Sequence, residues 1–458
     1  MSSEWASVSI SEIAGDWKGS MAVGPFGSRM KADLYVPSGV RVIRGNNLSG
    51  GREPEGNYVY VTEQTADSLA SCCLKPGDLV FPHRGNIGEV GITPDDGLRY
   101  MLSTSLMKLS PDRKKAEPLY LMYFFKSAIG RAALLMNASQ VGTPGIATPL
   151  RSLRGIQLPL PPPVVQRQIA DTLSKLDDRI TLLRETNATL EAIAQALFKS
   201  WFVDFDPVRA KLEGRTPEGM DEATAALFPD GFEESELGLV PRGWKVMPMG
   251  QLCSVTIGGL WGKDEQEEVG LTRAISLRGV DLEHLRIYGF AEKAPVRWVK
   301  DSAMEKRRLN ETQVLVASSG AGPCGRPLWG GVAFEALYGM PVIFSNFVKR
   351  LDCETSGRAI FIDRMLANMR ETREIWNYIN GTSIPNLDDR LLLATKKVLL
   401  PSNEILSAFE TISRTFYELL YSQQAQTLAT LRDTLLPRLI SGQLRLPEAK
   451  SLIEESVA

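Results

Sequence analysis

Hydrophobic residues recur at heptad spacing over a long stretch of the chain that begins after three consecutive prolines at 161–163. One row of the repeat consists of Ile169, Leu176, Leu183, Leu190 and Leu197, and the other consists of Leu173, Ile180, Asn187, Ala194 and Trp201. Two interleaved seven-residue repeats predict a long α-helix with a coiled-coil seam. Asn187 lies within the seam, where a polar residue costs stability but fixes the register of the pairing.

A second amphipathic helix is predicted over residues 404–441, and Pro437 and Gly442 mark its end. Its predicted seam contains Phe409, Ile412, Phe416 and Leu419, then shifts and continues with Leu428, Leu431 and Leu435. Because both seams are long, narrow and leucine-rich, we expect the two helices to pair with each other. The alternative is two separate helices, each lying on its own domain.

The rest of the sequence resembles one unit written twice. Residues 74–85 (LKPGDLVFPHRG) align without gaps on residues 309–320 (LNETQVLVASSG), and residues 43–48 resemble residues 277–282. The offset stays close to 235 residues along the chain, and a shared order at a constant offset indicates a tandem duplication. Short runs rich in Val, Ile, Leu, Phe and Tyr alternate with Gly and Pro in both units, which predicts short strands in a loop-rich fold. A helix is expected in each unit, at 118–136 and 357–379.

The predicted fold class is α+β, with two similar α/β domains joined by two long helices that form an antiparallel coiled coil, in an internal pseudo-two-fold repeat. We place the first domain at 1–160, its long helix at 161–213 and a linker at 214–242. The second domain follows at 243–401, its long helix at 402–446 and a C-terminal tail at 447–458.

Composition and charge narrow the function only slightly. The chain has 458 residues, of which 43% are hydrophobic and 23% are charged, as in ordinary globular proteins. Residues 1–160 carry a net charge of +3 and residues 241–400 a net charge of +4, whereas residues 161–240 carry −7. Two mildly basic blocks permit DNA binding without establishing it. No apolar run approaches the ~18 residues that span a bilayer, and the N-terminus lacks the pattern of a signal peptide, so we expect a cytoplasmic protein.

Catalytic and metal-binding motifs are absent from the sequence. Residues 258–263 (GGLWGK) come nearest to a phosphate-binding loop, but their spacing is wrong and Asp264 replaces the Ser or Thr that would bind magnesium. Five cysteines without a CxxC pair, together with two histidines, do not predict a metal site or a disulfide framework. We therefore expect no active site, no metal and no cofactor in this chain.

Four segments resemble the specificity subunit of Type I restriction-modification enzymes. Residues 196–211 (ALFKSWFVDFDPVRAK) are similar to the central region that characterises this family, and residues 435–444 (LLPRLISGQL) to its distal region. Residues 24–36, followed by VIRGNN at 42–47, resemble the opening of the first target-recognition domain, and residues 237–246 resemble the entry to the second. The resemblance covers nearly the whole chain.

This resemblance implies a non-catalytic DNA reader. Each recognition domain would read one half of a bipartite target in double-stranded DNA, and the paired helices would set the spacer. Two methyltransferase subunits would dock along the helices and methylate adenine with S-adenosylmethionine, and two restriction subunits would use ATP and Mg. For Trp201, Phe202 and Phe205 at the helix end, both a core position and a methyltransferase-docking surface remain open. The alternatives are a coiled-coil scaffold without a DNA role and a stand-alone DNA-modifying enzyme.

DNA reading requires Arg, Lys, Asn, Gln, Ser or Thr side chains on loops that can enter a groove. The candidates in the first unit are Ser28, Arg29, Lys31, Arg44, Asn46, Asn47, His83, Arg84 and Asn86. Those in the second unit are Arg278, Arg307, Arg308, Ser318, Ser319, Arg326 and Lys349. Arg84 and Asn86 rank first, because the neighbouring Gly85 and Gly88 permit a close approach of the backbone. The alternative for each candidate is an ordinary solvated loop residue.

Overall fold

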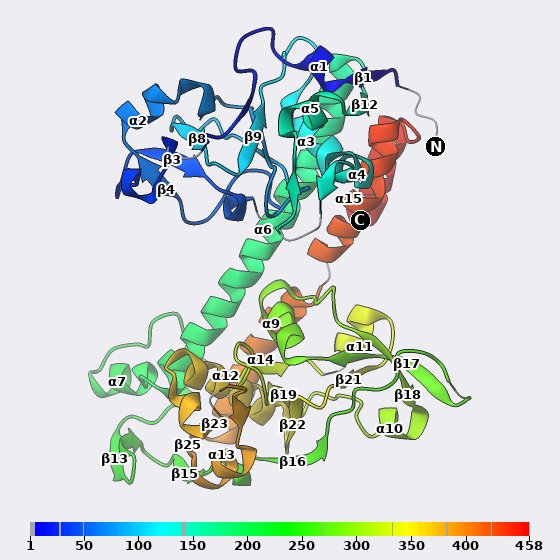
Figure 1. The fold of residues 1–458 in the computed structure, drawn as a ribbon. Coiled ribbons are helices and arrows are strands. Elements are labelled where there is room, and N and C mark those ends of the chain that lie inside the picture. Colours follow the sequence, from blue (N-terminus) through cyan, green and yellow to red (C-terminus); the bar gives the residue numbers. More distant parts are fainter. Residues whose placement is uncertain are drawn as a thin grey trace. The chain divides into compact units, whose positions relative to one another are not determined.

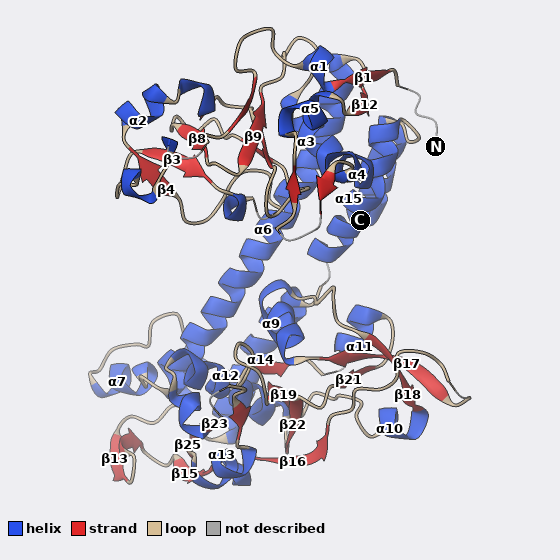
Figure 2. Cartoon of the chain, viewed as in Figure 1, coloured by secondary structure: helices blue, strands red, loops and turns tan. Residues whose placement is uncertain are grey.

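The computed structural model describes residues 5–26, 29–48, 50–139, 143–267, 269–331, 333–381, 383–422 and 424–457 (Figures 1 and 2). The chain divides into two compact units. Unit 1 comprises residues 1–180 and 427–458, and unit 2 comprises residues 181–426. Each unit therefore contains one of the two predicted domains together with a part of the long helices. No helix in the described ranges is long and apolar enough to cross a membrane.

Unit 1 is built on two four-stranded sheets. The first has the order β2 (Met21–Val23), β9 (Leu106–Leu109), β6 (Leu79–Pro82) and β7 (Gly91–Ile92). The second has the order β4 (Val59–Val61), β3 (Val40–Ile43), β8 (Tyr100–Leu102) and β5 (Cys73–Leu74), with β3 and β8 parallel. Two short pairs complete the strands, namely β1 (Ser7–Ser9) with β12 (Gln157–Pro159) and β10 (Ala138–Ser139) with β11 (Gly145–Ile146).

Unit 2 repeats this topology. Its four-stranded sheet has the order β16 (Cys253–Gly258), β22 (Val348–Cys353), β19 (Gln313–Ala317) and β20 (Pro327–Trp329). A three-stranded sheet contains β18 (Val296–Lys300), β17 (Leu271–Leu277) and β21 (Val342–Phe344), with β17 and β21 parallel. The short pairs are β15 (Lys245–Pro248) with β25 (Lys397–Leu400) and β23 (Ile379–Asn380) with β24 (Asn386–Leu387). Because strand order and the parallel pair recur, the predicted duplication is confirmed.

The helices between the strands follow the same repeat. Unit 1 contains α1 (Ile10–Ile13), α2 (Glu63–Ser68), α3 (Pro118–Lys126), α4 (Ala128–Leu135), α5 (Pro149–Arg154) and the C-terminal α16 (Leu446–Val457). Unit 2 contains α7 (Asp206–Leu212), α8 (Glu222–Leu227), α9 (Gly279–Tyr288), α10 (Asp301–Glu305), α11 (Ala333–Tyr338), α12 (Ser356–Glu371) and α13 (Asp389–Thr395). The helix predicted at 118–136 is split, because Ser127 is extended and caps α4 by accepting a hydrogen bond from the Gly130 amide. The predicted linker contains α8 and the hairpin of β13 (Phe232–Ser235) and β14 (Gly238–Pro241).

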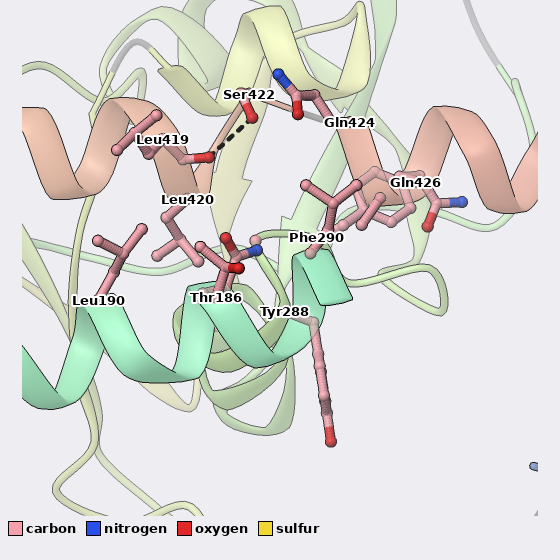
Figure 3. Close-up of a pocket in the computed structure, with 13 residues that line it drawn as sticks. Thr186, Leu190, Tyr288, Phe290, Leu419, Leu420, Ser422, Gln424 and Gln426 are labelled. Carbon is pink, nitrogen blue, oxygen red and sulfur yellow. Dashed lines mark hydrogen bonds between the residues drawn. The ribbon is translucent and has the colours of Figure 1, made fainter. Parts of the chain in front are cut away.

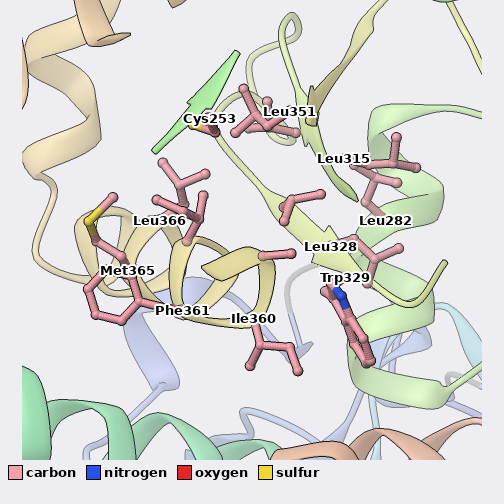
Figure 4. Close-up of a cluster of buried hydrophobic side chains, with 14 of the residues drawn as sticks. Cys253, Leu282, Leu315, Leu328, Trp329, Leu351, Ile360, Phe361, Met365 and Leu366 are labelled. Carbon is pink, nitrogen blue, oxygen red and sulfur yellow. The ribbon is translucent and has the colours of Figure 1, made fainter. Parts of the chain in front are cut away.

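The core of unit 2 lies between α12 and the four-stranded sheet. Leu366 points from α12 toward the strands that carry Leu315 and Leu328 (Figure 4). Ile360 and Phe361 lie on the opposite side of α12, where the Phe361 ring contacts Phe198 and Phe202 of α6 (Pro163–Phe202). The side chains of Leu366, Leu315, Leu328, Ile360 and Phe361 are at most 2% exposed. Helix α12 is therefore buried between the sheet on one side and α6 on the other, a layered arrangement that agrees with the α+β prediction.

The first long helix, α6 (Pro163–Phe202), runs for 40 residues without interruption. In unit 1 its seam residues Ile169, Leu173, Leu176 and Ile180 are at most 4% exposed. In unit 2 the seam residues Asn187, Ala194 and Trp201 are buried, and Leu183, Leu190 and Leu197 are half-buried. The heptad prediction for this helix is therefore confirmed.

The second long helix is not continuous, which corrects the prediction of one helix over 404–441. It forms α14 (Asn403–Leu420) and α15 (Gln424–Ser441), with a turn at Tyr421 and Ser422. The Ser422 hydroxyl donates to the Leu419 carbonyl at 2.8 Å, a local bond that competes with the helical hydrogen-bond pattern (Figure 3). A cavity of about 80 Å³ lies at this break, lined by Leu183, Asn187 and Leu190 of α6 among others.

The seam predicted for α14 is correct at Phe409, which is buried, but further along the helix the buried positions lie one residue later than predicted. Leu419 is 49% exposed, whereas Ser413, Tyr417 and Leu420 are buried. The hydrophobic pattern misses this face because two of its positions carry hydroxyl groups. In unit 2, Phe409 lies against Phe198 and Trp201, while Leu420 shares the cavity with Leu183 and Leu190. Hence α14 runs antiparallel to the second half of α6. In unit 1, α15 contacts the first half of α6 through the ion pair of Arg432 with Asp177.

Candidate nucleic-acid interface

A loop and a hairpin are joined at the end of strand β6 in unit 1. The His83 carbonyl accepts from the Ile146 amide at 2.9 Å, and the Gly85 amide donates to the Pro144 carbonyl at 2.9 Å. Arg84 forms an isolated bridge with Gly145. We call residues 83–88 together with β10 and β11 the loop–hairpin pair of unit 1. Gly85 and Gly88 both have positive φ, which glycine adopts without strain.

Unit 2 carries the same arrangement at the end of β19. Ser319 forms an isolated bridge with Asn386, and the Gly320 amide donates to the Pro385 carbonyl at 3.1 Å. The Leu387 amide donates to the Ser318 carbonyl at 2.8 Å. Residues 318–320 with β23 and β24 are therefore the loop–hairpin pair of unit 2. In this arrangement Ser319 takes the place of Arg84.

Five of the DNA-contact candidates in unit 1 have exposed side chains. Arg84 and Asn86 in the loop–hairpin pair are exposed, as are Arg29, Lys31 and Asn46. Within the described part of the chain, none of these five side chains forms a hydrogen bond or an ion pair. They are therefore available to phosphates or base edges without first breaking a contact. Ser28, the remaining candidate next to Arg29, lies outside the described residues.

Three first-unit candidates are instead used inside the fold, which corrects our prediction for them. The Asn47 side chain is 1% exposed and donates to the carbonyls of Glu55 and Asn57 at 2.8 and 3.2 Å. Arg44 binds the same Asn57 carbonyl at 3.2 Å. His83 is 8% exposed, with its Nε2 3.2 Å from the Thr104 carbonyl, and burial lowers the pKa of its ring. These contacts hold loops in place and leave Asn47 and His83 out of reach of DNA.

In the second unit the predicted cations all have partners. Arg278 binds the buried Asp281 through two bonds of 2.9 Å and so caps α9, which is a structural role. Arg307 donates to the carbonyls of Gly258 and Ala303 at 2.9 and 3.1 Å. Ser318 is only 7% exposed. The predicted DNA contacts of Arg278, Arg307 and Ser318 are therefore corrected, because their polar atoms are engaged or buried.

Three other cations of unit 2 remain candidates. Arg308 pairs with Glu335 at 2.6 Å, Arg326 with Glu283, and Lys349 with Asp389 at 3.6 Å. Surface pairs of this kind contribute only about 0–1 kcal/mol, so a phosphate can replace the carboxylate at small cost. The half-buried Ser319 also stays in the set.

Sequence reasoning missed two exposed apolar residues beside the loop–hairpin pair of unit 2. Phe347 is 61% exposed, and its carbonyl accepts from the Ser318 amide at 2.8 Å. Ile384 is 63% exposed and belongs to the turn between β23 and β24. Our search for DNA contacts considered polar side chains only. The sequence shows only that both are apolar residues, and their exposure beside the loop–hairpin pair was decided by the tertiary structure.

The aromatic residues at the end of α6 belong to the core of unit 2. Trp201 and Phe202 are 3% and 7% exposed, and the Phe202 ring contacts the rings of Phe361 and Phe409. Phe205 is partly buried against Trp244. The docking interpretation of Trp201 and Phe202 is therefore wrong, because packed rings offer no surface to another protein.

Comparison with known proteins agrees with this arrangement. Residues 27–192 match the family model described as Type I restriction modification DNA specificity domain. The HindI specificity subunit of a Type I restriction enzyme from Haemophilus influenzae is 37% identical over 161 residues, a match covering 34% of each chain. The MjaIX specificity subunit from Methanocaldococcus jannaschii is 25% identical over 416 residues, covering 85% of this chain and 84% of the relative. The crystal structure of a Type I restriction-modification S subunit from M. genitalium shares the fold, with a TM-score of 0.55, 15% identity and 96% of both chains covered.

The duplicated α+β fold with its loop–hairpin pairs is thus similar to the fold of a Type I specificity subunit. The similarity to a Type I restriction modification DNA specificity domain covers residues 27–192, and the similarity to the MjaIX specificity subunit extends over most of the chain. The resemblance indicated by the sequence segments is confirmed. The match to the HindI subunit spans about a third of that relative's length.

Proposed function

We propose that this chain is the non-catalytic subunit that reads DNA for a Type I restriction-modification enzyme, with each recognition domain reading one half of a bipartite target. The observation that carries this proposal is the recurrence of the loop–hairpin pair with different residues at matching positions. Arg84 in unit 1 corresponds to Ser319 in unit 2 on the same backbone arrangement. One scaffold with two sets of side chains suits two readers of different sequences.

The proposed partners rest on the similarity to Type I specificity subunits. Two methyltransferase subunits bound along the long helices bring S-adenosylmethionine to adenine, and two restriction subunits use ATP and Mg. In this proposal the chain itself binds double-stranded DNA and holds no cofactor. A scaffold without a DNA role and a stand-alone modifying enzyme are the alternatives.

Exchange of one domain tests whether the two halves read independently. We expect a graft of residues 1–160 onto the second half of another specificity subunit to produce a hybrid target, because unit 1 has its own core and its own loop–hairpin pair. The measurement is the methylated motif, determined at base resolution across a genome with and without the hybrid gene. Methylation that changes in both half-sites would contradict independent reading, and loss of all methylation from an intact complex would contradict it as well.

The Arg84→Ala variant tests the reading residue of unit 1. We expect the affinity for the specific target to fall about ten- to a hundredfold, because a bidentate arginine–guanine contact contributes about 1–3 kcal/mol. The thermal stability should stay unchanged, since Arg84 is exposed and unpaired within the described residues. Lys114→Ala is the matched control, because Lys114 is exposed in the segment before α3 and its loss removes the same charge. Equal weakening of target binding by both variants would mean that Arg84 contributes charge alone.

A further inference from the structure

A part-buried tyrosine–aspartate hydrogen bond connects the domain of unit 1 to its long helix. The Tyr123 hydroxyl of α3 donates to Asp177 Oδ2 of α6 at 2.7 Å, and Tyr123 is 1% exposed. The other carboxylate oxygen of Asp177 binds Arg432 of α15 at 2.7 Å. Burial, and then the neighbouring Asp177, raise the pKa of Tyr123, so its hydroxyl remains a donor at neutral pH.

Unit 2 contains the same contact with the two residue types exchanged. The Tyr417 hydroxyl of α14 donates to Asp363 Oδ2 of α12 at 2.5 Å. Tyr417 is 2% exposed and Asp363 is fully buried. Arg286 of α9 forms an ion pair with the same carboxylate. The tyrosine thus belongs to the long helix in unit 2 and to the domain in unit 1.

The two contacts occupy equivalent places in the repeat. Helices α3 and α12 each follow the second strand of their four-stranded sheet, β9 or β22. Helices α6 and α14 each follow the last strand of the unit, β12 or β25. Asp177 and Tyr417 stand at the same position counted from Pro163 and Asn403, the first residues of those helices. The two units therefore carry the same tyrosine–aspartate pair at one equivalent site, with the two residue types exchanged between the domain helix and the long helix.

We propose that this inverted pair makes each domain specific for its own long helix. Two domains of the same topology and two similar helices lie in one chain, so backbone shape discriminates poorly between right and wrong combinations. Domain 1 on α14 would place Tyr123 against Tyr417, two rings without an acceptor. Domain 2 on α6 would place the fully buried Asp363 against the half-buried Asp177, two carboxylates with no tyrosine donor between them. Buried like charges and unsatisfied polar groups both oppose docking, which gives the correct combination its advantage.

The Asp177→Tyr variant of the full chain creates the wrong combination within unit 1. We expect amide hydrogen exchange in α3 and the first half of α6 to accelerate by about tenfold or more, because a buried hydroxyl loses its acceptor. Exchange in α12 and α14 should stay unchanged. The double variant Tyr123→Asp with Asp177→Tyr restores the pair in the orientation of unit 2, and we expect it to recover most of the protection.

Two controls separate this role from ordinary packing. Asp177→Asn keeps the size of the side chain and weakens the bond to Arg432, so it measures the loss of that ion pair alone. If Asp177→Tyr were no worse than Asp177→Asn, or if the double variant were no better than Asp177→Tyr, the proposal would be overturned. The reciprocal set in unit 2, Tyr417→Asp with and without Asp363→Tyr, gives the same comparison should Asp177→Tyr fail to fold. The inference concerns assembly of the fold, so its outcome is independent of the proposed DNA reading.

Discussion

Replacing Glu191 by Ala is expected to lower the free energy of unfolding of unit 2 by about 3 kcal/mol. Glu191 of α6 binds Arg286 and Arg364 at 2.7 Å each, and Arg364 is 1% exposed. Removing the carboxylate leaves a buried guanidinium without its main partner. The loss falls at the lower end of the usual range because Asp363 remains beside both arginines.

Tryptophan fluorescence during denaturant unfolding measures this effect, since Trp201, Trp244 and Trp329 lie in the core of unit 2. Glu185→Ala is the matched control, because Glu185 is exposed on the same helix and surface changes of this kind stay within about 0.5 kcal/mol. If both variants unfolded at the same denaturant concentration, the ion pairs of Glu191 would contribute nothing measurable to stability.

The Glu191 carboxylate also makes the stability of unit 2 depend on pH, and the direction of its pKa shift gives the sign of this dependence. Burial acts to raise the pKa of Glu191, but Arg286 and Arg364 outweigh it and hold the pKa below the ordinary value of 4.5. A lowered pKa in the folded state contributes stability above pH 4.5, and this contribution disappears as the pH falls through the lowered pKa. The Glu191→Ala variant should therefore lose less stability than the natural chain upon acidification.

Lengthening the long helices by one heptad is expected to lengthen the spacer of the DNA target. Helix α6 passes without interruption from unit 1 into unit 2, so seven residues inserted after Ala188 preserve the register of its seam. A matching heptad belongs in the 424–430 segment, where α15 begins. At ~1.5 Å per residue the insertion adds ~10.5 Å. We expect both half-sites to keep their sequences while the spacer grows by about three base pairs, at ~34 Å per turn of DNA.

The methylated motif of the variant, determined across a genome, measures this prediction. Three added base pairs also rotate one half-site by roughly 100°, so weaker methylation is an expected side effect. An insertion of two residues at the same point is the control, because it breaks the 3.5-residue repeat and should abolish methylation. A heptad variant that modifies the original spacing would show that the helices do not set the distance.

The sequence by itself determined the features that depend on local periodicity. The seam of α6 was predicted correctly because one stripe of the helix is buried or half-buried along its whole length, so its heptads appear in the sequence. The duplication was predicted because matching segments keep their order and offset. The loop around Arg84 could be found for a similar reason, since its two glycines mark a turn that only positive φ permits.

Only the tertiary structure decided the roles of polar residues whose partners are distant in sequence. The buried face of α14 includes Tyr417, which is acceptable there because Asp363, from another helix, accepts a hydrogen bond from its hydroxyl. Asn47 and Arg278 are residue types that commonly contact DNA. In the structure, however, Asn47 holds a loop through hydrogen bonds to two carbonyls, and Arg278 caps a helix through Asp281. A hydrogen bond or an ion pair is directional and short-ranged, and no sequence pattern shows which groups folding brings within its reach.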